Sequence, residues 1–271
     1  MATSVWIGSP LGDAATLTVS AEVATLPGSN LKKLQPARVW DAGTTSATIT
    51  FQLATATACT AIAIMAHNLT SGATLRFRGA TSQGNLTASP GVDSGVVSAW
   101  PASGMPVDEV VGFPYLSSQV IVSNTTAYTW WSLLITSASN IRVGRAMLGK
   151  AYRPVINLGN NIGIQPITKG EVRRSDFNQI NTEERGVNGR RLILPFNAIN
   201  RIDFRKYILP FQMQHGVAKD FFFCADAAAQ EEFQAYSGQM LFEDTSGFER
   251  QRMFDSDGGR WASQISLMEV T

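Results

Sequence analysis

Short apolar segments with a two-residue period, separated by turn residues, constrain the fold of this chain more than any other feature. Residues 47–53 alternate apolar and polar side chains, which places Ile49, Phe51 and Leu53 on one face of a strand. Residues 60–66 are almost continuously apolar, which is typical of a strand covered on both faces. Further strands are predicted at 74–78, 118–123, 128–136 and 141–148, with no convincing helix among them. These segments predict an antiparallel β-sandwich.

The density of charged residues divides the chain near residue 150. The first 150 residues hold 8 basic and 6 acidic side chains, whereas the remaining 121 residues hold 14 basic and 15 acidic ones. A chain of 271 residues is also longer than one core usually supports. Tyr152, Arg153 and Pro154 form a natural joint, because proline interrupts regular strand pairing. We therefore expect a sandwich domain over 1–150 and a second domain over 151–271.

The second domain mixes strand and helix patterns, so we expect a small α+β fold. A strand over 190–194 is predicted to stop at Pro195, and a helix from Ala198 is predicted to end before Pro210. Residues 221–224 read as a buried strand, and 227–236 as a second short helix. Residues 248–254 and 261–270 are predicted to form a hairpin across the turn-rich residues 255–259.

A long stretch rich in Gly, Ser and Pro, residues 80–115, is predicted to be a loop. It also contains apolar residues, namely Val96, Val97, Trp100, Met105 and Phe113. Two interpretations remain open: a surface loop held by a few apolar anchors, or a functional segment that a partner orders.

Residues with catalytic or metal-binding chemistry are few and scattered. Cys59 and Cys224 lie far apart, and we expect two buried free thiols rather than a disulfide. No motif joins Cys224 to His215, and the remaining histidine, His67, follows an apolar strand. The two histidines and two cysteines lack the paired spacing of zinc ligands. We therefore predict that the protein is not an enzyme and has no cofactor or metal site.

The charge balance and hydropathy exclude two further classes of partner. A formal net charge of +1 removes the broad electrostatic case for nucleic-acid binding. No apolar run approaches the ~18–20 residues that span a bilayer, and the N-terminus has no secretory signal pattern. We expect synthesis in a cytoplasm and no insertion into a membrane.

Tryptophan side chains are the candidates for stacking against sugar rings. Trp130 and Trp131 are consecutive in a predicted strand, so they face opposite sides and at most one belongs to the core. Trp40 and Trp100 are the candidate contacts for a glycan or a protein partner. Packing in a core or an interface is the alternative role for these residues.

A polar, charged segment in the second domain is the candidate subunit interface. Its charged residues are Arg173, Arg174, Glu183, Glu184 and Arg185. Arginine and carboxylate groups in such a segment fix the register of contacts between subunits. A solvated loop is the other interpretation of this segment.

Several elements taken in order resemble the galactose-binding-like jelly roll of bacteriophage tail proteins. They are Leu26-Pro27-Gly28-Ser29-Asn30-Leu31 with Ala37-Arg38-Val39-Trp40, then Ile62-Ala63-Ile64-Met65-Ala66-His67-Asn68-Leu69, then 74–79 and 141–149. The second half resembles the small β domain of tail-tip and distal tail proteins of long-tailed phages, through 192–195, 221–223 and 263–270. In that family the domain order is commonly reversed, with the ring domain first.

The resemblance implies a structural role in a virion. It implies a distal tail or baseplate subunit at the tail tip, in a ring of copies of itself (a hexamer in this family). Its neighbours would be the tail tube and the tip or hub proteins. The alternative function is a carbohydrate-binding module that recognises a host-surface glycan during adsorption.

Overall fold

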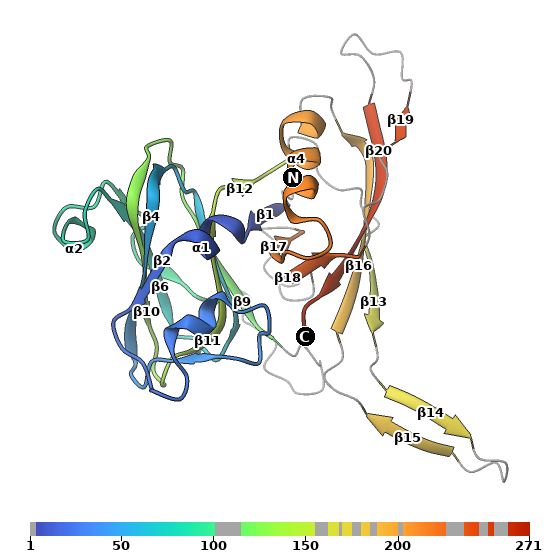
Figure 1. Ribbon diagram of the computed structural model, residues 1–271, viewed down its shortest axis with the longest axis horizontal. Helices are drawn as coiled ribbons and strands as arrows, with labels where there is room; N and C mark the ends of the chain where they lie inside the picture. The colour runs from blue at the N-terminus through green and yellow to red at the C-terminus, as the bar shows by residue number, and fades with distance from the viewer. Residues whose placement is uncertain are drawn as a thin grey trace.

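The computed structural model describes residues 4–100, 115–154, 162–167, 170–174, 180–184, 189–199, 203–225, 236–243, 249–251 and 260–271. The protein is mainly β, and every strand pairing among these residues is antiparallel. Figure 1 shows a sandwich on one side and a larger sheet with a helix on the other. This agrees with the predicted fold class.

Two sheets face each other in the sandwich. The described strands of one are β2 (Thr16–Val19), β4 (Ser46–Thr57), β10 (Tyr128–Thr136), β6 (Thr74–Ala80) and β7 (Val92–Asp93), with β8 (Val97–Ser98) also paired to β6. Those of the other are β3 (Trp40–Asp41), β11 (Arg142–Gly149), β5 (Ala61–His67) and β9 (Ser117–Ile121). Short helices α1 (Pro10–Ala14) and α2 (Asn85–Ala88) and the 3-10 turn η1 (Gly28–Lys32) complete this part.

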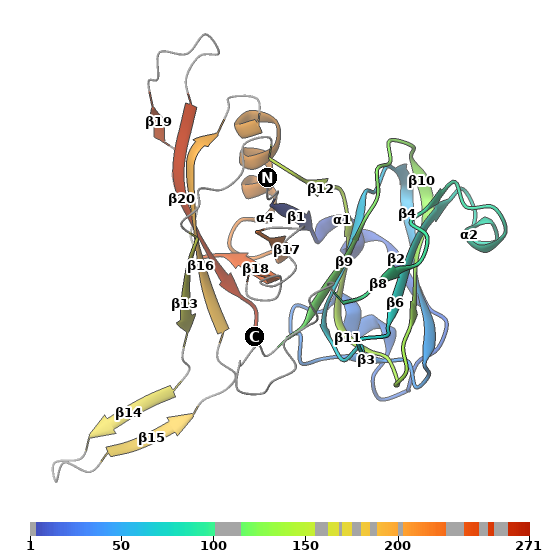
Figure 2. The same ribbon diagram turned by 180° about the vertical axis from the view of Figure 1, so that it is seen from behind.

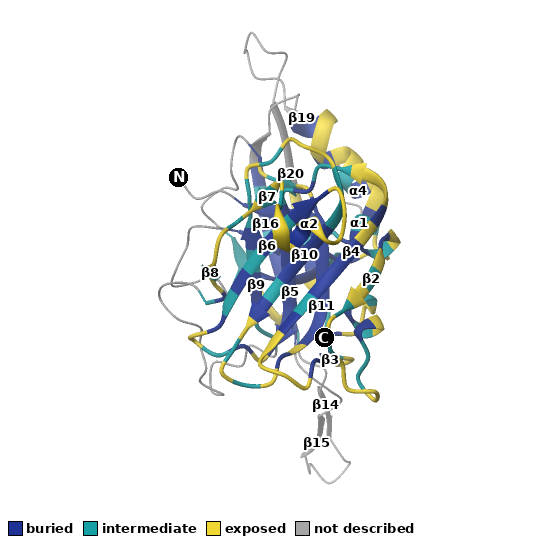
Figure 3. Cartoon of the chain, turned by 90° about the vertical axis from the view of Figure 1, so that its left-hand side faces the viewer, coloured by how far each residue is buried: buried dark blue, intermediate teal, exposed yellow. Residues whose placement is uncertain are grey.

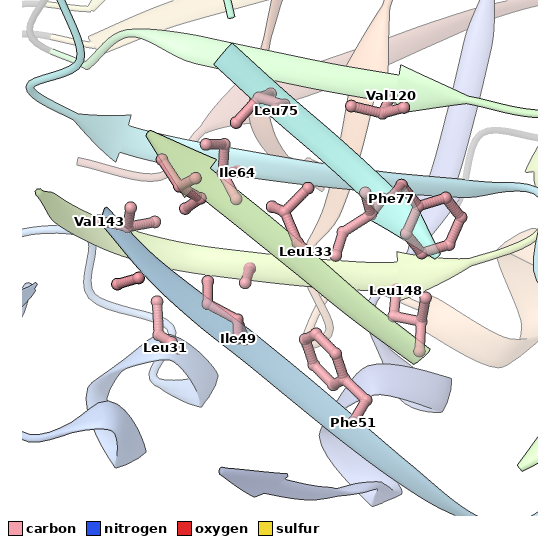
Figure 4. Close-up of a cluster of buried hydrophobic side chains, with 14 of the residues drawn as sticks. Leu31, Ile49, Phe51, Ile64, Leu75, Phe77, Val120, Leu133, Val143 and Leu148 are labelled. Carbon is pink, nitrogen blue, oxygen red and sulfur yellow. The ribbon is translucent and has the colours of Figure 1, made fainter. Parts of the chain in front are cut away.

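The sandwich core comes from the alternation seen in the sequence. Ile49, Phe51 and Leu53 of β4 are all buried, as the period of two predicts. They meet Ile64 of β5 and Leu148 of β11 from the facing sheet (Figure 4). Figure 3 shows this buried interior running along β4 and β10. Burial of these side chains is the main source of stability of the sandwich.

A larger sheet forms the second part. In order its described strands are β12 (Ala151–Tyr152), β1 (Val5–Gly8), β17 (Phe221–Cys224), β18 (Ser237–Phe242), β20 (Arg260–Glu269), β16 (Gly189–Ile199) and β13 (Gly163–Ile167), and β19 (Glu249–Gln251) pairs with β20. The π-helical segment η3 (Phe204–Ile208) and helix α4 (Leu209–His215) cover one face. A separate two-stranded sheet contains β14 (Gly170–Arg174) and β15 (Ile180–Glu184).

The first strand does not belong to the sandwich, so the expected bounds 1–150 do not follow the sheets. Strand β1 pairs with β17 along Val5↔Cys224 to Gly8↔Phe221. Strand β5 is apolar throughout because its two faces pack against different apolar clusters. Ile62 and Ile64 face the sandwich core, while Ala61, Ala63 and Met65 pack against β1 and β17. The two parts therefore share an apolar layer in addition to the joint near residue 152.

Two prolines do not end the elements that the sequence assigned to them. Strand β16 continues through Pro195, which pairs with β20 on one side while the described pairing with β13 stops at Ile193. Pro195 therefore has only one described neighbouring strand, and proline is tolerated at such an edge position. No helix starts at Ala198: the strand runs to Ile199, and the helical segment begins at Phe204. This helical segment continues through Pro210. The π-helical turn ends at Ile208 and α4 begins at Leu209, so Pro210 lies in the first turn of α4, where proline is tolerated.

The remaining predicted segments have mixed outcomes. The predicted hairpin near the C-terminus is present as β19 paired with β20, and Ile265, Leu267 and Glu269 of β20 are buried in alternation. Part of 80–115 is more regular than a loop, because β7 and β8 both pair with β6. Residues 101–114, the predicted helix 227–236 up to residue 235, and the turn 255–259 lie outside the described residues.

Candidate functional site

The predicted interface segment forms the hairpin of β14 and β15. Its backbone register places Glu171 opposite Glu183 and Arg173 opposite Asn181. Arg174 ends β14 and Glu184 ends β15, so four of the five candidate residues lie on this hairpin. Arg185 lies outside the described residues. Figures 1 and 2 both show the hairpin extending away from the rest of the molecule.

The structure corrects the assignment of Trp40 as a glycan contact. Trp40 is 0% exposed, lies in the sandwich core and donates its indole N–H to the Ala21 carbonyl at 3.1 Å. Trp100 is half-buried, packs against the same core and donates to the Leu69 carbonyl at 2.8 Å. Both rings are thus used in packing. Trp131 is buried and Trp130 only half-buried, which confirms that the two point to different environments.

The histidines and cysteines do not form a nucleophilic pair. His67 is buried, with Nε2 2.8 Å from Ser118 Oγ, and burial lowers its pKa to about 4. His215 contacts Phe221 on the helix-covered face of the large sheet, whereas Cys224 packs in the layer shared with the sandwich. Cys59 and Cys224 are both free and buried, as predicted. Burial raises the pKa of the Cys59 thiol to about 12, which makes it a poor nucleophile.

Neither a metal-binding cluster nor a membrane-spanning helix occurs among the described residues. No group of three or more His, Cys, Asp or Glu side chains in this part of the chain is arranged to hold a metal ion. No helix among the described residues is long and apolar enough to cross a membrane.

A buried charge network joins the two parts of the molecule, and sequence reasoning missed it. Arg145 of β11 is 1% exposed and binds Asp220, just before β17, through Nε–Oδ2 at 2.8 Å and Nη2–Oδ1 at 2.9 Å. The same guanidinium binds Asp13 of α1 at 2.7 and 2.9 Å. Gln239 donates to Asp220 at 2.7 Å and to the Leu34 carbonyl at 2.9 Å. Burial opposes the charge of Arg145, but the hydrogen bonds that its guanidinium donates to the two carboxylates outweigh burial and raise its pKa.

A second buried ion pair lies within the large sheet. Arg190 of β16 binds Glu269 of β20 through both guanidinium and backbone donors, and it also donates to the Ser237 carbonyl at 3.1 Å. Both side chains are buried. This pair fixes the register of strands at the end of the sheet opposite the helix. Its partners are 79 residues apart, so no local sequence pattern could have indicated it.

A groove of about 400 Å³ is lined by residues of α1, β12, η3 and α4 and of the strand ends beside them. The sandwich contributes Thr57, Gly149 and Lys150, and the helical segment contributes Lys206, Tyr207 and Gln214. The inner wall is apolar or aromatic and consists of Gly8, Pro10, Leu11, Tyr152, Pro210, Phe211 and His215. The groove therefore exists only because the two parts of the molecule are held together.

Two exposed lysines give the groove a positive rim. Lys150 and Lys206 are exposed, and the groove lining includes no Asp or Glu. Tyr207 stacks on Tyr152 with ring centroids 4.8 Å apart, and the Lys206 ammonium lies 5.2 Å from the centre of the Tyr207 ring. This contact holds the Lys206 charge at the rim of the groove.

Buried polar atoms in the groove wall lack hydrogen-bond partners within the described residues. They are Nε2 of His215 and the hydroxyl of Tyr152. Nδ1 of His215 lies 2.8 Å from the Phe211 carbonyl, so it carries the proton and leaves Nε2 as an acceptor. Burial lowers the pKa of His215, which keeps the ring neutral at pH 7. Burial, followed by Asp203 and Tyr207, raises the pKa of Tyr152 and keeps its hydroxyl protonated.

No family model matches this chain, and no curated protein does. A structure of reduced XRCC1 bound to the DNA pol beta catalytic domain has a TM-score of 0.37 and 14% identity, covering 54% of this chain and 99% of that chain. Chitosan-binding module 1 of a chitosanase/glucanase from Paenibacillus sp. IK-5 has a TM-score of 0.35 and 10% identity, and the match covers 50% of this chain and 94% of that chain. CpGH89CBM32-6 from Clostridium perfringens has a TM-score of 0.33 and 14% identity, and the match covers 51% of this chain and 94% of that chain. Such low scores carry no argument about function, and the sandwich is established by the strand pairings themselves.

Proposed function

We propose that this chain is a structural subunit of a bacteriophage tail tip that associates with copies of itself through the β14–β15 hairpin. The observation that carries the proposal is the hairpin itself. Its strands form a two-stranded sheet of their own, and the pairings of the described strands attach neither to the large sheet. An isolated two-stranded hairpin is marginally stable in water, so a hairpin that leaves the body is best explained by a neighbour that receives it.

The charges of the hairpin suit a contact with fixed register. Between Gly170 and Glu184 the sequence holds four acidic and two basic residues. Charges of both signs set the orientation of neighbouring subunits more than they add affinity. A contact between different surfaces of identical subunits closes into a ring when its rotation allows. The sequence resemblance to distal tail proteins supports a ring of six copies between the tail tube and the tip proteins, in the virion.

The alternative of glycan recognition by the sandwich loses part of its basis. Trp40 is buried, and Trp100 uses its indole N–H within the protein. Neither ring forms an exposed stacking platform at the end of the sandwich. Assembly is therefore the function that we place first.

The test is the assembly state of the full-length chain with two charges reversed. Arg173→Glu combined with Arg174→Glu should abolish ring formation in native mass spectrometry and exclude the protein from tails. A matched control, Lys33→Glu with Arg38→Glu, reverses two exposed charges on the sandwich and should assemble normally. A wild-type chain that stays monomeric at all concentrations and inside particles, or an Arg173/Arg174 variant that assembles, would contradict the proposal.

A further inference from the structure

The groove between the two parts has features of a ligand site that assembly does not explain. It combines an apolar wall with hydrogen-bonding groups at its rim, and its volume falls in the range of ~300–1,000 Å³ typical of small-molecule sites. Its residues come from segments distant in sequence, held together by the Arg145 network. The site is thus built by the fold rather than by one loop.

The charges of the groove select an anionic ligand. Lys150 and Lys206 contribute two exposed ammonium groups, whereas the lining holds no Asp or Glu and the nearby Asp203 is buried. Lys206 is also positioned by the Tyr207 ring, which reduces the entropy lost when an anion binds. A neutral or cationic ligand would leave these two charges without a partner.

The uncharged groups of the groove select a ligand that also carries hydroxyls. His215 is 3% exposed, and its Nε2 has no hydrogen-bond partner within the described residues. Nε2 is buried against Gly8, so a ligand in the groove meets the His215 ring as part of the wall and finds its hydrogen-bonding groups elsewhere in the lining. Thr57, Tyr207 and Gln214 supply these donors and acceptors. Leu11 and Pro210 supply apolar surface for the C–H face of a sugar ring.

We propose that this groove binds an acidic saccharide unit, with its acid group between Lys150 and Lys206 and its hydroxyls toward Gln214, Tyr207 and the wall formed by His215. The open groove accepts the end of a chain or a single residue within it. This site does not include Trp100, and it does not depend on ring formation.

The test uses isothermal titration of the full-length protein with matched probes. Two acidic probes, a tetrasaccharide of alternating glucuronic acid and N-acetylglucosamine and glucose 6-phosphate, distinguish a carboxylate from a phosphate as the acid group. A neutral N-acetylglucosamine tetramer and a tetraglutamate peptide lack one of the two required features. We expect binding of at least one acidic saccharide and of neither control probe.

Variants then locate the site. Lys150→Gln with Lys206→Gln should weaken binding by about tenfold, which corresponds to about 1.4 kcal/mol for the two exposed contacts together. Lys33→Gln, at an exposed site on the sandwich, should bind like the wild type. The Arg173→Glu/Arg174→Glu variant should also bind normally, so failure here is separable from failure of the assembly proposal. Absence of binding to both acidic probes, equal binding of tetraglutamate, or an equal loss in Lys33→Gln would overturn the inference.

Discussion

Arg145 and Asp220 form a bidentate ion pair that is almost completely buried between the sandwich and the large sheet. The guanidinium is 1% exposed and the carboxylate 5%. The two residues are 75 positions apart, and Asp13, from near the N-terminus, binds the same guanidinium. Taking such charges out of water costs free energy, which offsets much of their attraction. Removing one member is nevertheless strongly destabilising, because it leaves the other charge buried without its partner.

Asp220→Asn should destabilise the protein strongly. The substitution leaves the Arg145 charge buried with only Asp13 as its anionic partner, and breaking a buried pair in this way costs about 3–5 kcal/mol. Urea unfolding followed by circular dichroism measures this loss. Asp13→Asn is the matched control: its side chain is 37% exposed, so water screens the contact and the loss should be about 1 kcal/mol or less. Equal losses in the two variants would mean that Asp220 has no special role.

Gly144→Ala should be among the most damaging substitutions in the sandwich. A Cβ at this position would lie 2.3 Å from the Pro36 carbonyl oxygen and 2.7 Å from the Ala66 Cβ. Since the first of these is backbone, strand β11 would have to move away from the segment before β3. We expect a loss of about 3 kcal/mol or a failure to fold, as for other severe overpacking. Gly72→Ala is the control, because a Cβ there meets nothing within 4 Å, and it should change the free energy of unfolding by less than about 1 kcal/mol. Thermal unfolding of both variants measures the difference.

The local patterns of the sequence predicted strands well, and they predicted the architecture in part. The alternation of Ile49, Phe51 and Leu53 and the apolar run of β5 depend only on neighbouring residues, and both were interpreted correctly. The pairing of β1 with β17 joins residues more than 200 positions apart, and no period reveals it. For the same reason the sequence analysis assigned the first residues to the sandwich domain 1–150, although β1 belongs to the large sheet.

The candidate sites show the same limit. Trp40 was a candidate contact for a glycan or a partner, with packing in a core as its alternative role, and the structure supports the alternative: the Ala21 carbonyl accepts the indole N–H and allows the ring to be buried. The groove collects Thr57, Lys150 and Lys206 from three segments, none of which carries a recognisable motif. The hairpin, by contrast, is local, and its charged residues could be singled out from composition alone.

His67 should make the protein less stable as the pH falls from about 6.5 to 4. Burial lowers the pKa of this histidine to about 4 in the folded protein, whereas the unfolded chain takes up the proton near 6.5. The unfolded state therefore binds more protons in this window, so the free energy of unfolding decreases as the pH is lowered, by up to about 3 kcal/mol. Urea unfolding at pH 7.5 and pH 5 measures the effect.

The control for that measurement is His67→Gln, which keeps a polar group near Ser118 but does not titrate. Its stability should fall less between the two pH values than that of the wild type. His215, whose pKa is also lowered by burial, leaves a smaller dependence of the same sign. An unchanged pH dependence in the variant would show that His67 is not protonated on unfolding.

Both cysteines should be unreactive in the folded protein and fully reactive once it unfolds. Cys59 and Cys224 are free, 0% exposed and in different cores, and burial raises the pKa of Cys59 to about 12. A thiol-disulfide reagent attacks the thiolate, so reaction requires both exposure and deprotonation. We expect negligible reaction with Ellman's reagent at pH 8 under native conditions. In ~6 M guanidinium, which unfolds such domains completely, two equivalents of thiol per chain should react.

The Asp220→Asn variant should expose Cys224 first, because Cys224 packs against Val5 and Ile7 in the layer between the two parts, whereas Cys59 should stay protected within the sandwich. Simultaneous reaction of both thiols in that variant would indicate that the two parts unfold as a single unit.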